Sequence, residues 1–382
     1  MLFWAIFDGI LAYLSPLIIT EHGLTKTSMG LLIGSSSVFG ALFDMAAAKM
    51  LPNTRYRRIF IVMFLLCLAY PFVLYNARVV GVYIAAMAMW GIYYDLKNFG
   101  LYNFVGTHIK AKDHVASFGI VQALQGAGYV IAPVIAGIAV AETITWVPFS
   151  YALFFLFLAF ICFVVLSAQM PAPTQKDLST KKQAAVSFRT LFSINKIIFP
   201  GLLLTFMLYV IDAFFWTIGP LLTEIFSGKH SELILAAYTF PALVVGWVVG
   251  KITTHVGKKK TAFMSLLLGS LLLMSFVFVA YDFLLTLGVV FFAGIFFSLS
   301  MPAVNGVYAD VIKENSNHEK EVEVLTDFYT NLGYVFGPAA AGFIADTMGI
   351  AAALSVVGFI GFCTAIILIL ITPLHITIPR EL

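Results

Sequence analysis

The sequence predicts an all-α membrane protein with 12 transmembrane helices in two pseudo-symmetric six-helix bundles. Three observations predict this class: the composition, a succession of long apolar segments, and an internal repeat spaced at about half the chain length. Of 382 residues, 61% are hydrophobic and 11% are charged, whereas a soluble domain carries about 25% charged residues. This composition excludes an ordinary soluble enzyme, and the net charge of +3 does not suggest nucleic-acid binding.

Twelve apolar segments are long enough to cross a bilayer as helices, since a hydrocarbon core ~30 Å thick requires roughly 20 residues. Barrel strands are shorter and alternate in polarity, so helices are expected throughout. The first segment leads into further apolar segments and is interpreted as a span rather than a cleavable signal peptide. The predicted spans cover residues 2–20, 28–50, 57–75, 79–106, 114–141, 147–168, 197–226, 231–254, 261–280, 283–311, 320–346 and 349–373.

Residues 169–196 form the one long polar interruption and are rich in Pro, Gln, Ser, Thr and Lys. We therefore predict an N-terminal bundle over 1–168, a cytoplasmic linker over 169–196 and a C-terminal bundle over 197–382. Among the 22 lysines and arginines, Lys97 lies within a span and only Lys26, Arg78 and Lys229 fall on the side opposite the termini. The positive-inside rule then places both termini in the cytoplasm and the protein in the cell membrane.

An internal repeat relates the two halves. The stretch GYVIAPVIAG at 128–137 returns as GYVFGPAAAG at 333–342, and GIYYDL at 91–96 returns as GIFFSL at 294–299. In the first span Asp8 precedes a Pro-Leu pair by eight residues, and Asp212 does the same in the seventh span. Three helices of each half thus match in the same order, as expected of a transporter built from two parallel repeats.

A loop signature after the second span resembles that of the major facilitator superfamily, and in topology the resemblance covers essentially the whole chain. The family signature begins Gly-x-x-x-Asp, which Gly40 and Asp44 match, and continues with a glycine and basic residues, which Gly257 and the lysines after it match in the second half. Ala47 and Thr254 replace the second glycine and the acid, so each half keeps a different part. The resemblance implies a gating role for this loop, with Asp44 capping the gate.

The repeated cassette resembles the fifth-helix motif of the same family, which is associated with exporters and antiporters, nearest to the 12-helix proton-coupled drug antiporter branch. Small residues allow helix backbones to approach closely, and a proline bends the helix. The resemblance implies one hinged helix in each half, and a small-residue packing seam is the alternative interpretation. The matching residues are Gly128, Pro133 and Gly137 in the first half and Gly333, Gly337, Pro338 and Gly342 in the second.

Acidic side chains within spans are candidates for the transport pathway because charge is costly in lipid. Asp212 shares a helical face with Tyr209 and Trp216. An acid flanked by aromatic rings can hold an organic cation through charge and cation–π attraction, or exchange a proton. Each acid could instead serve only packing, through a structural partner. The acids within spans are Asp8, Asp44, Asp95, Asp212 and Asp327.

Asp95 and Lys97 are two positions apart and point in directions about 160° apart around a helix, so no local ion pair is expected. Asp95 shares the more polar face with Asn98 and is favoured for the pathway. Lys97 is then either a member of a structural pair or a proton-linked switch.

Span five presents Gln122, Gln125 and Tyr129 on one face. The repeat maps Gln122 to Asp327 and Tyr129 to Tyr334. These side chains are candidate pathway residues, and hydrogen bonding between helices is the alternative role.

Together these features predict a secondary active transporter with alternating access and proton-coupled export of small amphiphilic or cationic compounds. One alternative is proton-coupled uptake of a polar nutrient or organic acid, with Lys97 and Asn98 binding substrate. Another is a lipid-handling or enzymatic membrane protein on the same scaffold, against which the short loops argue.

No phosphate-binding loop sequence occurs, so ATP is not expected to drive the protein. The spacing of the three cysteines and seven histidines indicates no metal site, and no cofactor is expected. The expected partners are a small-molecule substrate, protons and the lipid bilayer, with no nucleic acid. The resemblance implies a monomer.

Overall fold

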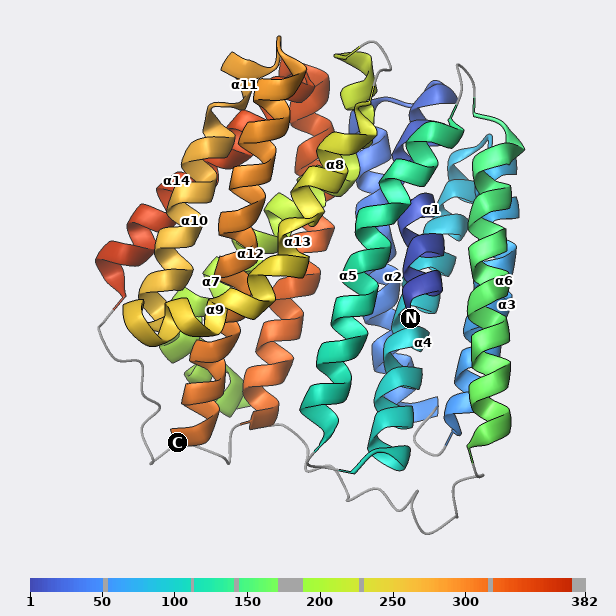
Figure 1. The fold of residues 1–382 in the computed structure, drawn as a ribbon, viewed down its shortest axis with the longest axis horizontal. Helices are drawn as coiled ribbons and strands as arrows, with labels where there is room; N and C mark the ends of the chain where they lie inside the picture. The colour runs from blue at the N-terminus through green and yellow to red at the C-terminus, as the bar shows by residue number, and fades with distance from the viewer. Residues whose placement is uncertain are drawn as a thin grey trace. The chain divides into compact units, whose positions relative to one another are not determined.

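The computed structural model describes residues 1–50, 54–110, 113–140, 144–170, 188–226, 230–314 and 319–372. All regular structure within these ranges is helical, which confirms the predicted class. The chain divides into two compact units, unit 1 over residues 1–183 and unit 2 over residues 184–382 (Figure 1). Residues 171–187, most of the predicted linker 169–196, lie outside the described residues.

Unit 1 contains six long helices, whose bounds agree with the first six predicted spans to within a few residues. Pro16, Pro71 and Pro133 lie inside three of them, as membrane helices tolerate when neighbouring helices satisfy the freed backbone groups. The helices are α1 (Leu2–Glu21), α2 (Lys26–Met50), α3 (Tyr56–Asn76), α4 (Val80–His108), α5 (His114–Ala139) and α6 (Trp146–Gln169).

Unit 2 follows the same order with three interruptions. The predicted span 197–226 begins earlier, at Phe188 inside the predicted linker, and ends in a 3₁₀ turn; spans 231–254 and 261–280 each break into two helices. The elements are α7 (Phe188–Ile218), η3 (Pro220–Glu224), α8 (Glu232–Thr239), α9 (Pro241–Val256), α10 (Lys258–Met274), α11 (Phe276–Val279), α12 (Phe283–Glu314), α13 (Glu319–Met348) and α14 (Ile350–Ile371).

The break between α8 and α9 lies at a proline. Pro241 is the first residue of α9, where the missing N–H is tolerated and the fixed φ suits a helix start. Helix α12 packs closely behind this point: a Cβ added to Gly294 would lie 2.7 Å from the backbone oxygen of Tyr238 and 3.4 Å from Cγ of Pro241. A larger residue at position 294 would push α12 away from the break.

The repeat in the sequence extends to the helix packing. In unit 1, α1 packs along α5, and α4 packs against α2 and α3 (Figure 1). In unit 2, α7 packs along α13, and α12 packs against α8, α9 and α10. Helices that correspond in the sequence therefore have corresponding neighbours within each unit.

The repeated Gly-Pro cassette forms close contacts between the paired helices of both units. In unit 1 a Cβ added to Gly9 of α1 would lie 2.6 Å from Cβ of Ala132 on α5. In unit 2 a Cβ added to Gly337 of α13 would lie 2.5 Å from Cβ of Ala213 on α7. The repeat makes Gly9 equivalent to Ala213 and Ala132 equivalent to Gly337. Each unit thus has one methyl group at this contact. In unit 1 it belongs to Ala132 on α5, and in unit 2 it belongs to Ala213 on α7.

Basic side chains close equivalent helix ends in the two units. Arg57 of α3 donates from Nη2 to the backbone oxygens of Ser167 and Met170, at 2.7 and 2.8 Å, at the end of α6. Lys259 of α10 donates from Nζ to the backbone oxygen of Thr372, at 3.0 Å, at the end of α14. Cations at helix C-termini satisfy free carbonyls and interact favourably with the helix dipole.

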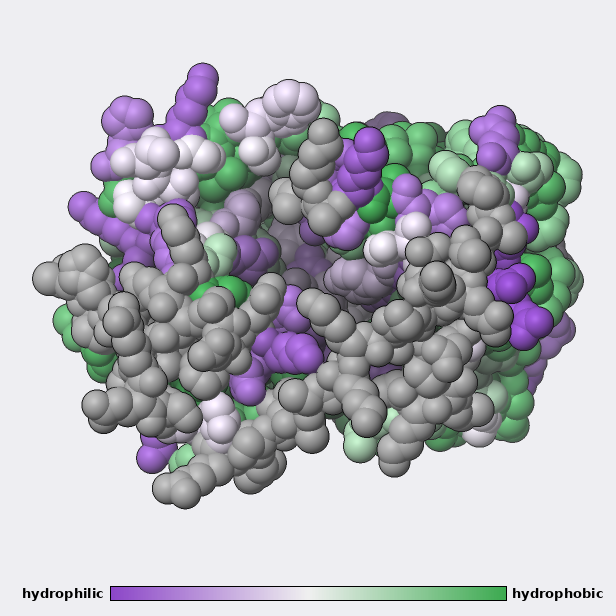
Figure 2. All heavy atoms as spheres, turned by 90° about the horizontal axis from the view of Figure 1, so that it is seen from below, coloured by the Kyte–Doolittle hydropathy of each residue, from purple (hydrophilic) through white to green (hydrophobic). Residues whose placement is uncertain are grey.

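The helix surfaces are those of membrane spans. In the described part of the chain, nine helical segments are long and apolar enough to cross a membrane. Large apolar side chains point outward, including Trp247 at 86% and Leu370 at 78% exposure, which an aqueous surface seldom tolerates over large areas. In the view from below, hydrophilic side chains gather on the end face and hydrophobic ones along the flanks (Figure 2).

Candidate functional site

Asp8 of α1 is a buried acid held by two tyrosines from neighbouring helices of unit 1. Its side chain is only 3% exposed. The hydroxyl of Tyr93 on α4 donates to Oδ1 at 2.7 Å, and the hydroxyl of Tyr129 on α5 donates to Oδ2 at 2.8 Å. Both carboxylate oxygens thus have donors, which lowers the cost of a charge at this depth.

Asp212 of α7 has the same arrangement in unit 2. The hydroxyl of Tyr334 on α13 donates to Oδ2 at 2.7 Å, and that of Tyr238 on α8 donates to Oδ1 at 3.0 Å. The ring of Tyr238 stacks on Phe215 with a centroid distance of 3.9 Å and an interplanar angle of 14°. The ring of Tyr209 lies 5.2 Å from that of Tyr334. Asp212 is partly exposed and surrounded by aromatic rings.

The repeat accounts for one donor of each pair. Tyr129 and Tyr334 occupy equivalent positions, and each donates to the equivalent acid. The second donors come from spans that do not correspond, since Tyr93 lies in span four and Tyr238 in span eight. Sequence reasoning missed both as acid ligands: Tyr93 lies on the same helix face as Lys97, and nothing in the repeat points to Tyr238.

Lys97 of α4 is buried among aromatic rings, with 3% exposure. Its Nζ lies 4.2 Å from the ring centroid of Tyr94 and 4.9 Å from that of Trp4, within the range of cation–π contacts. Trp4 precedes Asp8 by four residues on α1, and its ring lies edge-on to that of Tyr93 at a centroid distance of 6.3 Å. Lys97 therefore belongs to the same buried cluster as Asp8.

Asp95 points elsewhere, toward α2. A Cβ added to Gly40 would lie 2.5 Å from Oδ2 of Asp95, so Gly40 makes room for this carboxylate. Asp44, one turn further along α2, is close enough for its charge to act on Asp95. Both acids are half-buried. The carboxylate of Asp95 thus lies against α2, whereas that of Asp8 lies between Tyr93 and Tyr129, and the charge of Lys97 acts on both acids.

The remaining predicted pathway residues differ in exposure. Gln122 and Asp327 are exposed, whereas Asn98, Gln125 and Trp216 are half-buried.

The predicted hinge residues lie in continuous helices. Pro133 is inside α5 and Pro338 inside α13. A Cβ added to Gly128 would lie 2.6 Å from Cβ of Ala5, and one added to Gly333 would lie 2.7 Å from Cβ of Tyr209. These glycines form the packing seams described above. Gly342 is buried and Gly137 half-buried.

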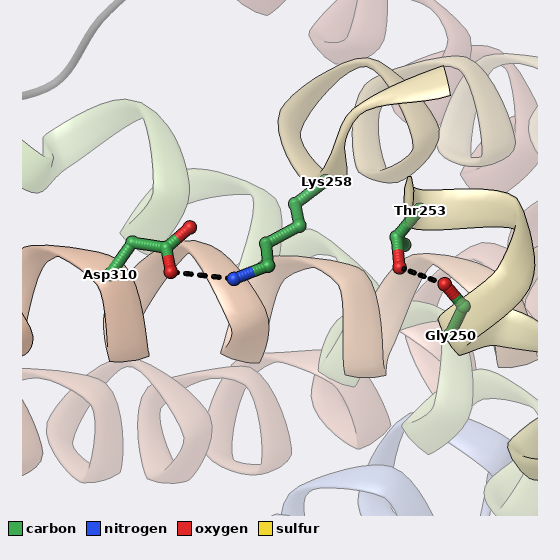
Figure 3. A network of polar contacts seen from close by, with 4 residues as sticks. All are labelled: Gly250, Thr253, Lys258 and Asp310. Atoms are coloured by element: carbon green, nitrogen blue, oxygen red, sulfur yellow. Dashed lines mark hydrogen bonds and ion pairs between the residues drawn. The ribbon is translucent and has the colours of Figure 1, made fainter. Parts of the chain in front are cut away.

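The loop after α9 is fixed by a glycine and an ion pair. Gly257 has φ +92°, a conformation that side chains rarely adopt. Nζ of Lys258 lies 2.6 Å from Oδ1 of Asp310 on α12, and Thr253 donates to the backbone oxygen of Gly250 at 3.1 Å (Figure 3). Thr254 stands in place of the acid of the family signature. The acid that pairs with this loop is instead Asp310, from helix α12.

In unit 1, His22 directly follows α1 and lies beside Arg78, which follows α3. Nη1 of Arg78 lies 3.4 Å from Nδ1 of His22. The hydroxyl of Tyr83, which donates to the backbone oxygen of Ala77, also contacts Nδ1 of His22. Partial burial and the charge of Arg78 lower the pKa of His22, while Glu21 acts in the opposite direction.

Two bundles of membrane-crossing helices, each holding an acid between tyrosines, are typical of a multi-pass membrane transporter. The family model of the Major Facilitator Superfamily matches residues 1–319, and the chain belongs to this family of secondary transporters. No match was found among curated protein sequences.

Solved transporters share the fold at low sequence identity. The nucleoside transporter NupG is 12% identical with a TM-score of 0.71, and the likeness covers 97% of this chain and 96% of that one. A bacterial homologue of the human lysosomal transporter Spinster, inward-facing and occupied, is 13% identical with a TM-score of 0.71, covering 97% and 92%. At these identities the likeness concerns the fold alone.

Proposed function

We propose that the protein is a proton-coupled secondary transporter that exports small amphiphilic or cationic compounds by alternating access. The observation that supports this most directly is the acid held between two tyrosines in each unit, Asp8 and Asp212. Ionisable groups inside membrane spans mark proton and substrate pathways by default. A carboxylate with two hydroxyl donors can be held charged and can also take up a proton, as a coupling site requires.

The aromatic surroundings of Asp212 support the cationic substrate class. This carboxylate is partly exposed, and Tyr209 and Tyr334 lie close beside it. A cation at this position would meet both a negative charge and aromatic ring faces. We further propose a monomer in the cell membrane with both termini in the cytoplasm, in line with the distribution of lysines and arginines.

Replacement of Asp212 by Asn tests the proposal. The variant retains the shape of the side chain but cannot carry charge or release a proton, so we expect coupled transport to be lost. The measurement is flux of a candidate compound in vesicles under an imposed pH gradient, with Asp113→Asn as the matched control, since Asp113 is exposed at the start of α5 and its side chain does not cap that helix. Full coupled transport by Asp212→Asn would contradict the role of this acid.

A second candidate is proton-coupled uptake of a polar nutrient or organic acid. The buried ammonium of Lys97 favours it, because a cation inside a span can attract an anionic or strongly polar substrate. One protein of similar fold, NupG, is a nucleoside transporter. The direction of flux in the same vesicles separates the two candidates: accumulation driven toward the alkaline cytoplasmic side would favour uptake over export.

A further inference from the structure

The two acids differ in the charge that surrounds them. In unit 1 the charge of Lys97 acts on both Asp8 and Asp95, although no ion pair joins it to either carboxylate. The match of GIYYDL to GIFFSL makes Ser300 the equivalent of Lys97 in unit 2. Ser300 is fully buried, and its Oγ donates to the backbone oxygen of Ala262 at 2.7 Å. Position 300 therefore supplies no charge to unit 2.

Asp212 has no charged partner within the described part of unit 2. The groups that bear on its carboxylate are the hydroxyls of Tyr334 and Tyr238. The cluster around Asp8 thus contains one acid and one base, whereas the cluster around Asp212 contains an acid alone. A charge buried in a span without a partner is costly, so a cation from outside the unit would be stabilised beside this carboxylate.

The two acids also differ in how far their side chains are exposed. Asp8 and Lys97 are each 3% exposed and Trp4 is 2% exposed, so these three side chains are buried, whereas Tyr129 and Tyr94 beside them are partly exposed. Asp212, Tyr209 and Tyr334 are each partly exposed. A ligand can therefore approach Asp212, whereas a ligand at Asp8 would have to displace side chains of unit 1.

Unit 1 also shows how this chain holds an ammonium group inside a span. The Nζ of Lys97 rests at 4.2 and 4.9 Å from two aromatic rings, a distance at which ring faces attract cations. Tyr209 and Tyr334 offer rings of the same kind beside Asp212, with their centroids 5.2 Å apart.

We propose that Asp212 is the acid that receives the cationic group of the substrate, and that Lys97 serves unit 1 as a tethered cation. The inference rests on the proposed function and deepens it by giving the two acids different tasks. Asp212 with Tyr209 and Tyr334 binds an organic monocation with an ammonium or phosphonium centre. Asp8, already compensated by Lys97, takes no substrate and is left to exchange a proton.

Equilibrium binding to the purified full-length protein in lipid nanodiscs tests the assignment. The probe is tetraphenylphosphonium, and neutral triphenylphosphine oxide is its uncharged comparison. We expect the cation to bind the wild type and Asp212→Asn to weaken it at least about tenfold, which corresponds to about 1.4 kcal/mol. We expect Asp8→Asn to change the affinity by less than about threefold, and Asp113→Asn, a change at an exposed acid at the start of α5, serves as the control. Equal losses at Asp8 and Asp212, no loss at Asp212, or no preference for the cation over the neutral compound would overturn the assignment.

A second measurement tests the tethered cation. Lys97→Ala opens a space beside Trp4 and Tyr94 that methylammonium, the size of the lost head group, can fill. We expect methylammonium to raise the melting temperature of Lys97→Ala but not of the wild type. Lys97→Met is the matched control, since it removes the charge while filling the space, and it should gain nothing. No gain in Lys97→Ala, or an equal gain in all three proteins, would refute this part.

These binding measurements use no pH gradient, so their failure differs from failure of the proposed function. Cation binding that depends on Asp212, without proton-coupled flux in vesicles, would refute the proposed function and support the assignment. If the wild type shows proton-coupled flux but Asp212→Asn binds the probe as well as the wild type does, the assignment is refuted and the proposed function stands.

Discussion

The contact between α7 and α13 allows the effect of one methyl group to be worked out. In Gly337→Ala the new Cβ would lie 2.5 Å from Cβ of Ala213, whereas ordinary contacts of this kind measure 3.4–4 Å. The next neighbours are the backbone oxygen and Cα of Val210, at 3.2 and 3.3 Å, and backbone cannot rotate away. The helices must therefore part by about 1 Å, and overpacking of this kind destabilises by ~1–3 kcal/mol.

The double variant Ala213→Gly with Gly337→Ala transfers the methyl group from α7 to α13 and removes the shortest contact. Ala213→Gly alone should destabilise by about 0.5–1 kcal/mol, because a glycine is more flexible in the unfolded chain. In the double variant one helix gains the alanine that the other loses, so we expect a free energy of unfolding within about 1 kcal/mol of the wild type. Unit 1 already has this exchanged arrangement in Gly9 and Ala132.

The assay is unfolding in mixed micelles with increasing SDS, followed by tryptophan fluorescence, for the wild type, both single variants and the double. Gly246→Ala on α9 is the control, since an added Cβ there meets nothing within 4 Å. Additive losses in the double variant would refute the reasoning. So would a loss in Gly337→Ala no greater than that in Gly246→Ala.

Three further predictions concern polar contacts. Arg57→Met removes two donors to carbonyls at the end of α6 and should lower the free energy of unfolding by about 1–2 kcal/mol in the same assay; an unchanged value would show that these bonds contribute nothing. Burial and the charge of Arg78 lower the pKa of His22 below 6.5, so the unfolded chain binds more protons than the folded chain near that pH. The melting temperature should therefore rise between about pH 5.5 and 7.5, and it should rise less in His22→Gln. Identical pH profiles of the two proteins would contradict this. Tyr334→Phe and Tyr238→Phe each remove one hydroxyl from the α7 carboxylate, a bond of about 1.5–3 kcal/mol, and should slow transport about ten- to hundredfold; a full rate in either variant would exclude that hydroxyl from the site.

Much of the fold was predictable because apolar length and charge exclusion are local properties of the sequence. All twelve predicted spans correspond to helices or to pairs of helices broken at Pro241, Ser275 and Gly219. The breaks themselves were not predicted. An apolar run has the same composition whether its helix is continuous or turns at one residue, and Pro16 and Pro133 lie in unbroken helices.

The candidate site was predictable only where the repeat constrained it. The repeat made Tyr129 equivalent to Tyr334 and Asp8 equivalent to Asp212, but it did not predict that each tyrosine donates to the acid of its own half. Helical periodicity gives the face on which a side chain lies but not the helix that it meets. For this reason Tyr238, from a different span, could not be found as a ligand of Asp212.

The two acids differ in whether a tyrosine that donates to them lies beside a helix break. Tyr238 is next to last in α8, directly before the break at Pro241, whereas Tyr93, which plays the same part for Asp8, lies within the uninterrupted helix α4. A bend at Pro241 would carry one hydroxyl away from the α7 carboxylate and leave that of Tyr334 behind. Helix α4 has no such break beside Tyr93. Bending at Pro241 would therefore break a hydrogen bond to Asp212 and leave both hydrogen bonds to Asp8 in place.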